Sequence, residues 1–301
     1  MVEQSAVGTP SRTVTTADGL ALAVYEEGPA DAPVVVLVHG YPDNHRVWDG
    51  VAGDLAADLR VVRYDVRGSG NSQVPASRAG YRMERLVDDL GRVIDAVSPD
   101  APVHLVAHDW GSIQCWDALP DDSLGDRIRS YTSLSGPSLD HAGVWLRDLR
   151  RGPLPRLKQL AASYYIYLFL TPGLPELAAR RGIIDRLVEH SESIARPDDA
   201  PAGAAVARGE KETVNGIELY RANVPGRLFR PNPPRVSLPV QVLVADRDVH
   251  VSPALAAGAP AAFVDDLTVE HLEGNHWVLA QRPAVVAGLV RGFVQRTATA
   301  G

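Results

Sequence analysis

Short apolar runs bounded by turn residues alternate with longer amphipathic stretches along the first 135 residues. The runs are rich in β-branched residues, as Val34-Val35-Val36-Leu37-Val38 illustrates, and continuous runs of this kind are typical of strands buried on both faces. The amphipathic stretches, residues 46–59 and 85–97, place apolar side chains on one side of a helix. The pattern therefore predicts a mostly parallel sheet covered by helices. The predicted strands are residues 13–16, 20–25, 34–38, 60–65, 102–107 and 131–135, and the first two form an edge hairpin through Asp18-Gly19.

This alternation stops after Ser135. Residues 136–235 show helical segments, an alanine-rich polar stretch at 197–210 and a proline-rich exit at 230–234. Strand-like runs return at 240–244 and 267–270, and a last helix is predicted at 283–294. We therefore expect one α/β core, made of residues 1–135 and 236–301, with a helical cap inserted at 136–235.

Composition and charge narrow the class of protein. The chain is 45% hydrophobic, which is enough for a packed core, and its 30 Lys and Arg residues are scattered within a net charge of -7, which argues against a nucleic-acid partner. The single cysteine, Cys115, excludes a disulfide within the chain and a cysteine-based zinc site. Residues 1–8 do not resemble a secretory leader, and the longest apolar segment, 161–170, is far shorter than the ~20 residues that span a bilayer. We expect a cytoplasmic protein without membrane insertion.

Chemically reactive side chains cluster directly after the predicted strands. Since the carboxyl ends of parallel strands meet at one edge of a sheet, these clusters predict a site at that edge. The clusters are His39-Gly40-Tyr41-Pro42, Asp65-Val66-Arg67-Gly68-Ser69-Gly70-Asn71-Ser72, His108-Asp109-Trp110-Gly111-Ser112, Ala245-Asp246-Arg247-Asp248 and Glu273-Gly274-Asn275-His276-Trp277.

Asp109 stands where a strand turns sharply into a helix, which is the place of the nucleophile in a nucleophile elbow. A carboxylate is poorly suited to attack an amide or ester, because an anhydride would form, whereas attack on tetrahedral carbon gives an alkyl ester of the enzyme. A serine esterase is therefore disfavoured. The alternative interpretation is that Asp109 only caps the helix that begins near Gly111.

Four of these clusters resemble the motifs of the epoxide hydrolase family of the α/β-hydrolase fold, and the resemblance extends over residues 13–294. It implies an eight-stranded, mostly parallel sheet flanked by helices, and an activity without a cofactor. It also implies that Asp248 supports His276 as the base, and that two cap tyrosines hold the epoxide oxygen. The segments at 163–173 and 216–223 point to Tyr165 and Tyr220 for these two donors. Residues 65–72 resemble the glycine-rich structural turn of the family, and they lack the Gly-Lys-Ser/Thr sequence of a P-loop.

The chemistry can also be built from the residues themselves. An epoxide has an alkoxide leaving group, so its opening needs both a nucleophile and a proton donor, and phenols of pKa near ~10 can donate at neutral pH. His276, held by Asp248, would then activate a water that hydrolyses the ester of Asp109, while the backbone N–H groups of Tyr41 and Trp110 stabilise the oxyanion. We expect an apolar epoxide and water as reactants. The predicted pocket residues are His39, Pro42, His108, Trp110, Phe169 and Trp277.

Several alternatives stay open on the sequence alone. Asp246 competes with Asp248 as the supporting acid, and Tyr164 and Tyr167 compete with Tyr165. His39 and His108 can orient loops instead of contacting substrate. The other histidines form no ligand-like cluster in the sequence, so no metal site is expected. A haloalkane dehalogenase would use the same aspartate, and a ligand-binding protein without turnover could share the fold. The oligomeric state is not predicted.

Overall fold

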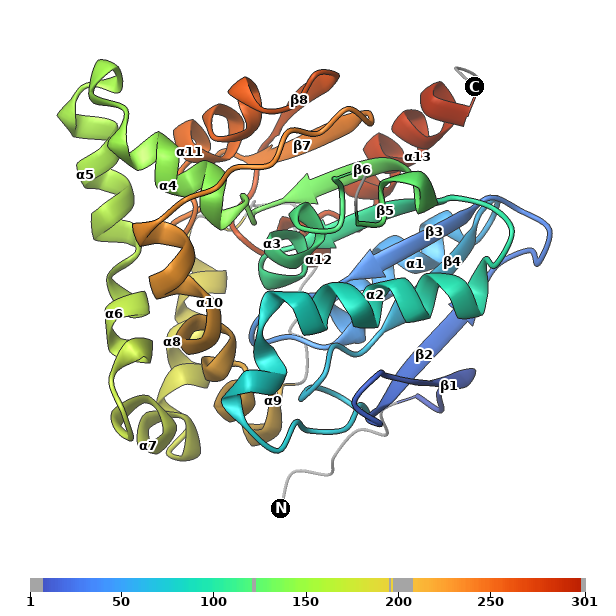
Figure 1. Ribbon diagram of the computed structural model, residues 1–301, viewed down its shortest axis with the longest axis horizontal. Coiled ribbons are helices and arrows are strands. Elements are labelled where there is room, and N and C mark those ends of the chain that lie inside the picture. Colours follow the sequence, from blue (N-terminus) through green and yellow to red (C-terminus); the bar gives the residue numbers. More distant parts are fainter. Residues whose placement is uncertain (1–7, 121–122, 195, 197–207, 299–301) are drawn as a thin grey trace.

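The computed structural model describes residues 8–120, 123–194, 196 and 208–298, and an eight-stranded sheet forms its centre. The strands follow the order β1-β2-β4-β3-β5-β6-β7-β8 (Figure 1). The pairs β1–β2 and β2–β4 are antiparallel and the other five are parallel, so the predicted mostly parallel sheet with an edge hairpin is confirmed. The strands are β1 (Arg12–Thr15), β2 (Ala21–Glu27), β3 (Val34–Val38), β4 (Arg60–Tyr64), β5 (Val103–His108), β6 (Ile128–Leu134), β7 (Val240–Ala245) and β8 (Leu267–Leu272).

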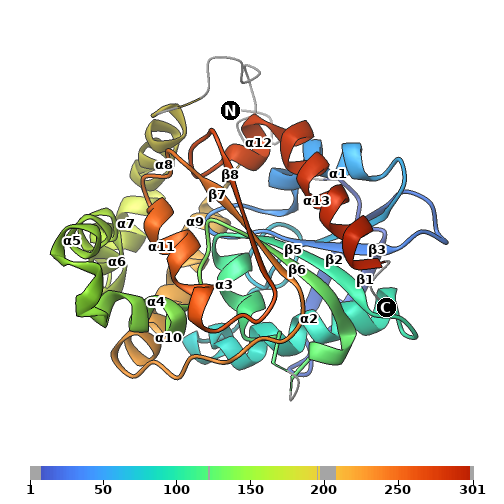
Figure 2. The same ribbon diagram turned by 90° about the horizontal axis from the view of Figure 1, so that it is seen from above.

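Helices cover both faces of this sheet. Figure 2 shows α1 (Asp49–Leu55), α12 (Val278–Gln281) and α13 (Pro283–Ala298) on one face, and α2 (Met83–Val97) and α3 (Trp110–Trp116) on the other. Because side chains alternate along a strand, β3 sends Val36 and Val38 into the apolar cluster on the α2 side and Val35 and Leu37 into the cluster on the α1 side. Shorter elements complete the core: α11 (Pro253–Gly258), η1 (His45–Trp48), η2 (Arg78–Tyr81), η3 (Gly125–Arg127) and η5 (Pro260–Ala262).

The helices between β6 and β7 stand beside the carboxyl ends of the parallel strands (Figure 1). We call them the cap helices: α4 (Leu139–Arg147), α5 (Pro153–Ala162), α6 (Tyr164–Leu170), α7 (Leu174–Arg180), α8 (Ile183–Ser193), α9 (Glu210–Asn215) and α10 (Ile217–Phe229), with η4 (Leu149–Arg151) between α4 and α5. Most of the alanine-rich stretch noted at 197–210 lies outside the described residues.

One predicted helix is shorter than its pattern indicates. Residues 46–59 form a 3-10 turn over His45–Trp48 followed by an α-helix that ends at Leu55. The chain turns over residues 56–59 because the amide of Arg60 must reach the carbonyl oxygen of Pro33, 3.0 Å away, at the start of the β3–β4 pair. In the part of the chain that the structure describes, no helix combines the length and apolar character needed to cross a membrane.

Candidate active site

Asp109 stands at the sharp turn between β5 and α3 in a strained backbone conformation, with φ 51° and ψ -124°. Such a conformation is costly for a non-glycine residue and is typical of functional sites. Glycines let the neighbouring chain approach this turn. A Cβ at Gly40 would lie 2.4 Å from Asp109 Oδ1, one at Gly136 would lie 2.1 Å from the Asp109 carbonyl oxygen, and one at Gly111 would lie 2.4 Å from the Val38 carbonyl oxygen. Side chains at these three glycine positions would collide with the turn. The turn can therefore present the Asp109 side chain at the sheet edge only because the three positions are glycines.

The carboxylate of Asp109 is held by backbone N–H groups. The amide of Tyr41 donates to Oδ1 at 2.7 Å, and the amide of Trp110 also donates to the carboxylate. Asp109 occupies the N-cap position of α3 without a side-chain capping bond, so the interpretation as a helix cap does not by itself account for its carboxylate. Burial would raise the pKa of Asp109, but His276, His108 and the amide of Trp110 lower it below its usual value. Asp109 is therefore an ionised carboxylate whose two oxygens have different surroundings.

His276 lies between two buried carboxylates. Its Nδ1 is 2.9 Å from Asp248 Oδ2 and its Nε2 is 3.5 Å from Asp109 Oδ2. Asp248 Oδ1 accepts from the amides of His250 and Val251 at 2.8 and 2.9 Å, which fixes the carboxylate. Burial would lower the pKa of His276, but the two carboxylates outweigh it and raise this pKa to about 10. Burial in turn would raise the pKa of Asp248, and His276 lowers it to about 2. The two carboxylates thus favour the protonated form of His276.

Asp246, the competing acid, lies apart from His276. Its Oδ1 is 2.6 Å from Nδ1 of His271, and both of these side chains are about half exposed. Of the two aspartates at the end of β7, Asp248 is the one that contacts the imidazole of His276.

Two tyrosines of the cap face Asp109 from the other side. Tyr165 and Tyr220 have ring centroids 6.1 Å apart and share a hydrogen bond between their side chains. Burial and the nearby carboxylates, including that of Asp109, raise the pKa of Tyr165, and burial raises that of Tyr220 as well. Both phenols therefore stay protonated at neutral pH. The competing residues Tyr164 and Tyr167 are exposed by 65% and 62%.

Two apolar cavities meet at this point. The larger, of about 330 Å³, extends between α6, α7 and α8, and Pro42, Phe169 and Trp277 line it. The smaller, of about 80 Å³, extends toward α4, α5 and α10, with Trp110 in its wall. The residues common to both cavities are Asp109, Tyr165, Tyr220 and His250. A molecule that reached Asp109 could therefore extend in two directions.

The remaining two predicted pocket residues, His39 and His108, line neither of these cavities. Nε2 of His39 accepts from the amide of Val66 at 2.9 Å, and Nε2 of His108 donates to the carbonyl oxygen of His276 at 2.9 Å. Burial and His276 lower the pKa of His108 to about 4, so this imidazole is neutral. His39 lines a separate small cavity with Pro42 and Trp110, and Asp109 is not part of that lining. In the cavities that reach Asp109 neither histidine is part of the lining, and each holds a loop of the site, which was the alternative.

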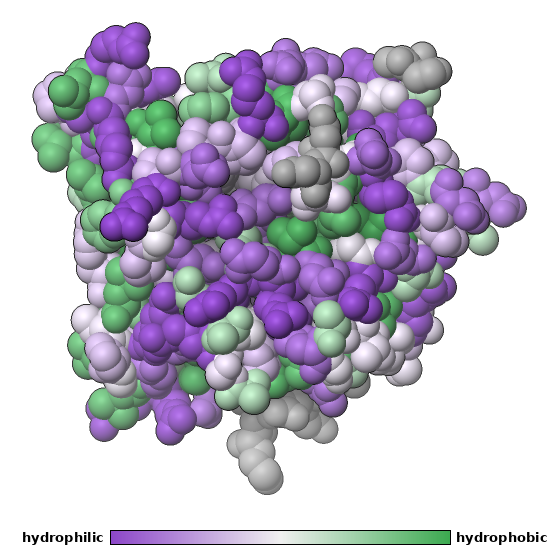
Figure 3. Space-filling view, viewed as in Figure 1, coloured by the Kyte–Doolittle hydropathy of each residue, from purple (hydrophilic) through white to green (hydrophobic). Residues whose placement is uncertain are grey.

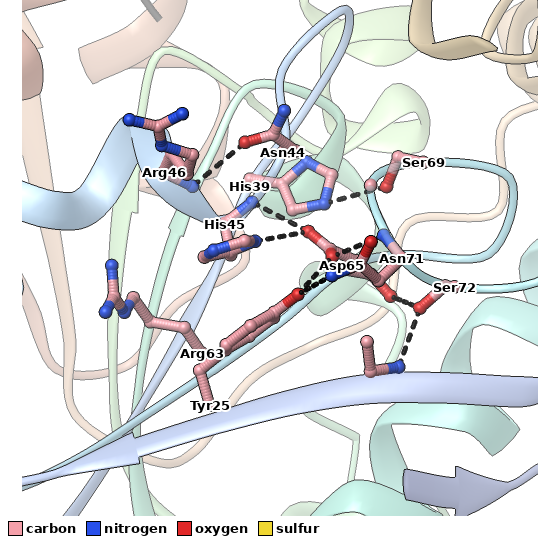
Figure 4. A network of polar contacts seen from close by, with 12 residues as sticks. Tyr25, His39, Asn44, His45, Arg46, Arg63, Asp65, Ser69, Asn71 and Ser72 are labelled. Atoms are coloured by element: carbon pink, nitrogen blue, oxygen red, sulfur yellow. Dashed lines mark hydrogen bonds and ion pairs between the residues drawn. The ribbon is translucent and has the colours of Figure 1, made fainter. Parts of the chain in front are cut away.

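The turn at 65–72 supports the loop that carries Tyr41. Figure 4 shows Asp65 at the centre of a polar network: Oδ1 accepts from Nδ1 of His45 at 2.8 Å, and Oδ2 accepts from the hydroxyl of Tyr25 at 3.0 Å and from the amide of Asn71 at 2.8 Å. Because the amide of Val66 in this turn donates to His39, the network fixes the strand end from which the loop that carries Tyr41 begins.

Three residues of the site surroundings were missed in the sequence. His250 lines both cavities, and its Nε2 is buried without a hydrogen-bond partner in the described structure. Gln159 on α5 donates to the carbonyl oxygen of His250 at 2.9 Å and accepts from the amide of Ser252 at 2.8 Å. Gln159 thereby joins the cap to the loop of the catalytic acid candidate. Because His250 follows the predicted acid Asp248 by two residues, its place near the site could have been predicted from the sequence. No sequence feature indicates the role of Gln159.

Arg208, also missed, joins the cap to the loop that carries Tyr41 and Asp43. Its Nε donates to Asp43 at 2.7 Å and its NH2 group to Glu192 at 2.6 Å, and its guanidinium lies 5.4 Å from the ring of Trp277. The indole N–H of Trp277 donates to the other oxygen of Asp43 at 3.1 Å. This buried cluster lies beside the loop of His276. Within the described residues, no three His, Cys, Asp or Glu side chains form a group that could hold a metal ion.

Comparisons with known proteins identify the fold family of the chain. The family model described as alpha/beta hydrolase fold matches residues 33–283. The chain is 36% identical over 302 residues to a "Probable oxidoreductase EphD" of Mycobacterium tuberculosis, covering 94% of this chain and 49% of that protein, so it spans about half the length of this relative. It is 28% identical to "Epoxide hydrolase 2" of Caenorhabditis elegans, covering 89% of this chain and 76% of that protein.

Solved structures are similar along nearly the whole chain. An epoxide hydrolase from metagenomes of hot environments superposes with a TM-score of 0.77 at 24% identity, covering 96% of this chain and 99% of the other. The epoxide hydrolase VrEH1 of Vigna radiata superposes with a TM-score of 0.72 at 26% identity, covering 95% of this chain and 97% of the other. These similarities support the same architecture, a sheet with helices beside its carboxyl edge.

Proposed function

Since this chain belongs to the alpha/beta hydrolase fold family, we propose that it is an epoxide hydrolase that converts an apolar epoxide to a vicinal diol through an ester of Asp109. The observation that carries the proposal is the pairing of a buried, ionised carboxylate at the nucleophile elbow with two protonated phenols across the same cavities. Relatives named epoxide hydrolases support it. The substrate class and the site residues assigned below belong to this proposal.

In the first step, Oδ2 of Asp109 attacks an epoxide carbon. The carbon–oxygen bond of the ring breaks, its electron pair stays on the epoxide oxygen, and this oxygen takes a proton from Tyr165 or Tyr220. Oδ2 is the free oxygen of the carboxylate, because Oδ1 is occupied by the amide of Tyr41. The attack converts Asp109 into a neutral ester. The negative charge of Asp109, one of the two that hold the proton on His276, is thereby lost. The imidazolium of His276 then gives its proton to the tyrosine that protonated the epoxide oxygen, which restores the phenol.

In the second step, the neutral imidazole of His276 takes a proton from water, and the oxygen of that water adds to the ester carbon of Asp109. Negative charge develops on Oδ1, to which the amide of Tyr41 already donates, and the amide of Trp110, which also donates to this carboxyl group, would help to stabilise it. The bond from the carboxyl carbon to Oδ2 breaks, and the leaving oxygen takes the second proton of the water. The products are the diol, the carboxylate of Asp109 and the imidazolium of His276, which is the starting state.

The two cavities indicate the shape of the substrate. Asp109 and the phenols lie where both cavities meet, and apolar side chains dominate both linings. An epoxide with apolar groups on both ring carbons would place one group in each cavity. The larger cavity, about 330 Å³, would hold the longer group.

Halide displacement is less well supported by the same site. A departing halide needs N–H donors that converge on it, and the indole N–H of Trp110 is already bonded to the hydroxyl of Tyr220. The groups that face Asp109 from the cap are hydroxyls, which suit an epoxide oxygen that must be protonated.

The proposal is tested by trapping the ester. His276→Ala removes the base of the second step, so treatment with styrene oxide should add the mass of one epoxide to the intact protein, on Asp109. Tyr165→Phe/Tyr220→Phe is the matched variant that blocks the first step, and it should form no adduct. In a parallel treatment of His276→Ala with 1-bromobutane, an added mass of one butyl group, with no adduct from styrene oxide, would instead identify a dehalogenase. Absence of any adduct in His276→Ala, with no diol from the native chain, would overturn the proposed function.

A further inference from the structure

The helix α5 is amphipathic, but it buries a polar side chain and exposes its leucines. Its single buried side chain is Gln159, whereas its three leucines, Leu154, Leu157 and Leu160, are exposed by 63%, 60% and 42%. A surface helix of a globular protein normally turns its leucines toward the core and its polar side chains to water. The leucines of α5 therefore do not serve the packing of this chain, and they form an apolar surface that is available to something else.

The same surface continues over the neighbouring cap helices. Eleven of the fifteen large apolar or tyrosine side chains that are exposed among the described residues lie between residues 149 and 194. We call this surface, which includes Leu154, Leu157, Tyr164, Tyr167 and Leu187, the apolar cap face. Figures 1 and 2 both place α5, α6 and α7 along one side of the molecule, and Figure 3 shows hydrophobic atoms at this margin beside hydrophilic ones. Exposed apolar surface of this extent marks an interaction site.

The apolar cap face leads into the larger cavity. Tyr164, Ile183, Leu187 and Ile194 are each at least 40% exposed and also line the cavity that reaches Asp109. Val249 of the Asp248 loop, which is 37% exposed, also lines this cavity. The rim of the active-site cavity and the exposed surface thus share residues. An apolar molecule could pass from this surface to Asp109 without crossing water.

Charge distinguishes the segment that carries this surface from the rest of the chain. The exposed charged side chains between residues 149 and 194 are six cations and one anion, in a chain whose net charge is -7. Two of the cations lie beside Asp148 and one lies 3.7 Å from Glu210. The cations are Arg150, Arg151, Lys158, Arg180, Arg181 and Arg186, and the anion is Glu189.

From these observations we infer that the apolar cap face docks on an anionic lipid surface, so that the larger cavity opens toward the hydrocarbon and takes its epoxide from there. Leucines would enter the boundary between headgroups and acyl chains, tyrosines would lie at that boundary, and the basic side chains would contact lipid phosphates. A second copy of this chain fits the face less well, since two such faces would bring six cations against six. Docking itself is independent of the proposed function, whereas the supply of substrate rests on it.

The test measures sedimentation of the chain with vesicles. Vesicles of phosphatidylcholine and phosphatidylglycerol should bind the native chain, and binding should weaken as salt screens the charges. The variant Leu154→Glu/Leu157→Glu/Tyr167→Glu should bind roughly 100-fold more weakly, because three apolar contacts are lost and three like charges are added. Lys158→Glu/Arg186→Glu should lose the preference for phosphatidylglycerol. The control, Val74→Glu/Val285→Glu, replaces side chains that are 43% and 46% exposed and lie outside the apolar cap face, and it should bind as the native chain does.

Activity separates this inference from the proposed function. None of the three substituted positions lines either cavity, so the first variant should hydrolyse styrene oxide in water as the native chain does. It should lose roughly tenfold or more on a long-chain epoxide dissolved in the vesicles, in proportion to the lost binding. Equal vesicle binding by the native chain and this variant would overturn the inference, as would self-association that the same variant abolishes. Vesicle binding without hydrolysis of any epoxide would leave the docking correct and refute the proposed function.

Discussion

The two sides of the site are held by different forces. On the core side, Asp109, Asp248 and His276 project from strand ends, and backbone amides and close carboxylate–imidazole contacts fix them. On the cap side, α5, α6 and α8 each bury a single side chain, namely Gln159, Phe169 and Ile184. The groups on the core side are therefore positioned by the fold itself. The position of the Tyr165 side chain depends instead on a few polar contacts between cap and core. The predictions below test this contrast.

The largest effect is expected on the core side, from Asp248→Asn. Loss of the anion removes the partner that holds the proton and tautomer of His276, and the rate of diol formation should fall by about 10⁴-fold. The matched control is Asp246→Asn, which changes an aspartate of the same loop that pairs with His271. Steady-state kinetics on styrene oxide should show nearly native rates for this control. Similar losses in both variants would contradict the assignment of Asp248.

Removing the Arg208 side chain should cost more stability than removing any exposed arginine of the cap. Arg208→Met leaves the carboxylates of Asp43 and Glu192 without their buried cation, which costs about 3–5 kcal/mol for such pairs. Arg180→Met, whose pair with Glu210 is about two-thirds exposed, should cost less than about 1 kcal/mol. Urea unfolding of both variants gives the two free energies. Equal values would show that the buried cluster does not join cap and core.

A smaller loss of stability, with a loss of activity, is expected from Gln159→Leu. The substitution leaves the carbonyl oxygen of His250 and the amide of Ser252 without partners, at a cost of about 1–3 kcal/mol. Because α6 follows directly, the position of Tyr165 should change and the rate of ester formation should fall. Gln241→Leu is a control from the core, where Gln241 is buried in β7. It should lose stability while single-turnover ester formation stays native in rate, and a parallel loss of rate would contradict the role of Gln159.

The smallest change is a shift of one pKa. Asp109→Asn mimics the neutral ester, and without this anion the pKa of His276 should fall from about 10, because an opposite charge favours the imidazolium. NMR titration of the imidazole nitrogens measures both values. Asp248 and its charge remain, so the fall should be only partial. An unchanged pKa would mean that ester formation does not prepare His276 to act as a base.

The core side of the site could be predicted because its motifs are local. Asp109 needs close glycines at the turn, and the turn, the strand before it and the helix after it are adjacent in sequence. The contacts of Gln159 and Arg208 could not be predicted, since their partners lie 91 and 165 positions away along the chain. His108 shows a second limit. It precedes Asp109 and suggests a pocket residue, yet alternation along β5 turns its ring toward Trp48 on the α1 face.

The hydrogen bond from the Tyr41 amide to Oδ1 has a consequence for the atoms of Asp109. The two carboxylate oxygens of Asp109 have different fates, because Oδ2 leaves with each diol and an oxygen of solvent takes its place, while Oδ1 stays where the amide of Tyr41 holds it. With every turnover the chain gives away one of its own atoms and receives another. After one turnover the protein is chemically identical to the newly synthesised chain, but one carboxylate oxygen of Asp109 comes from solvent water.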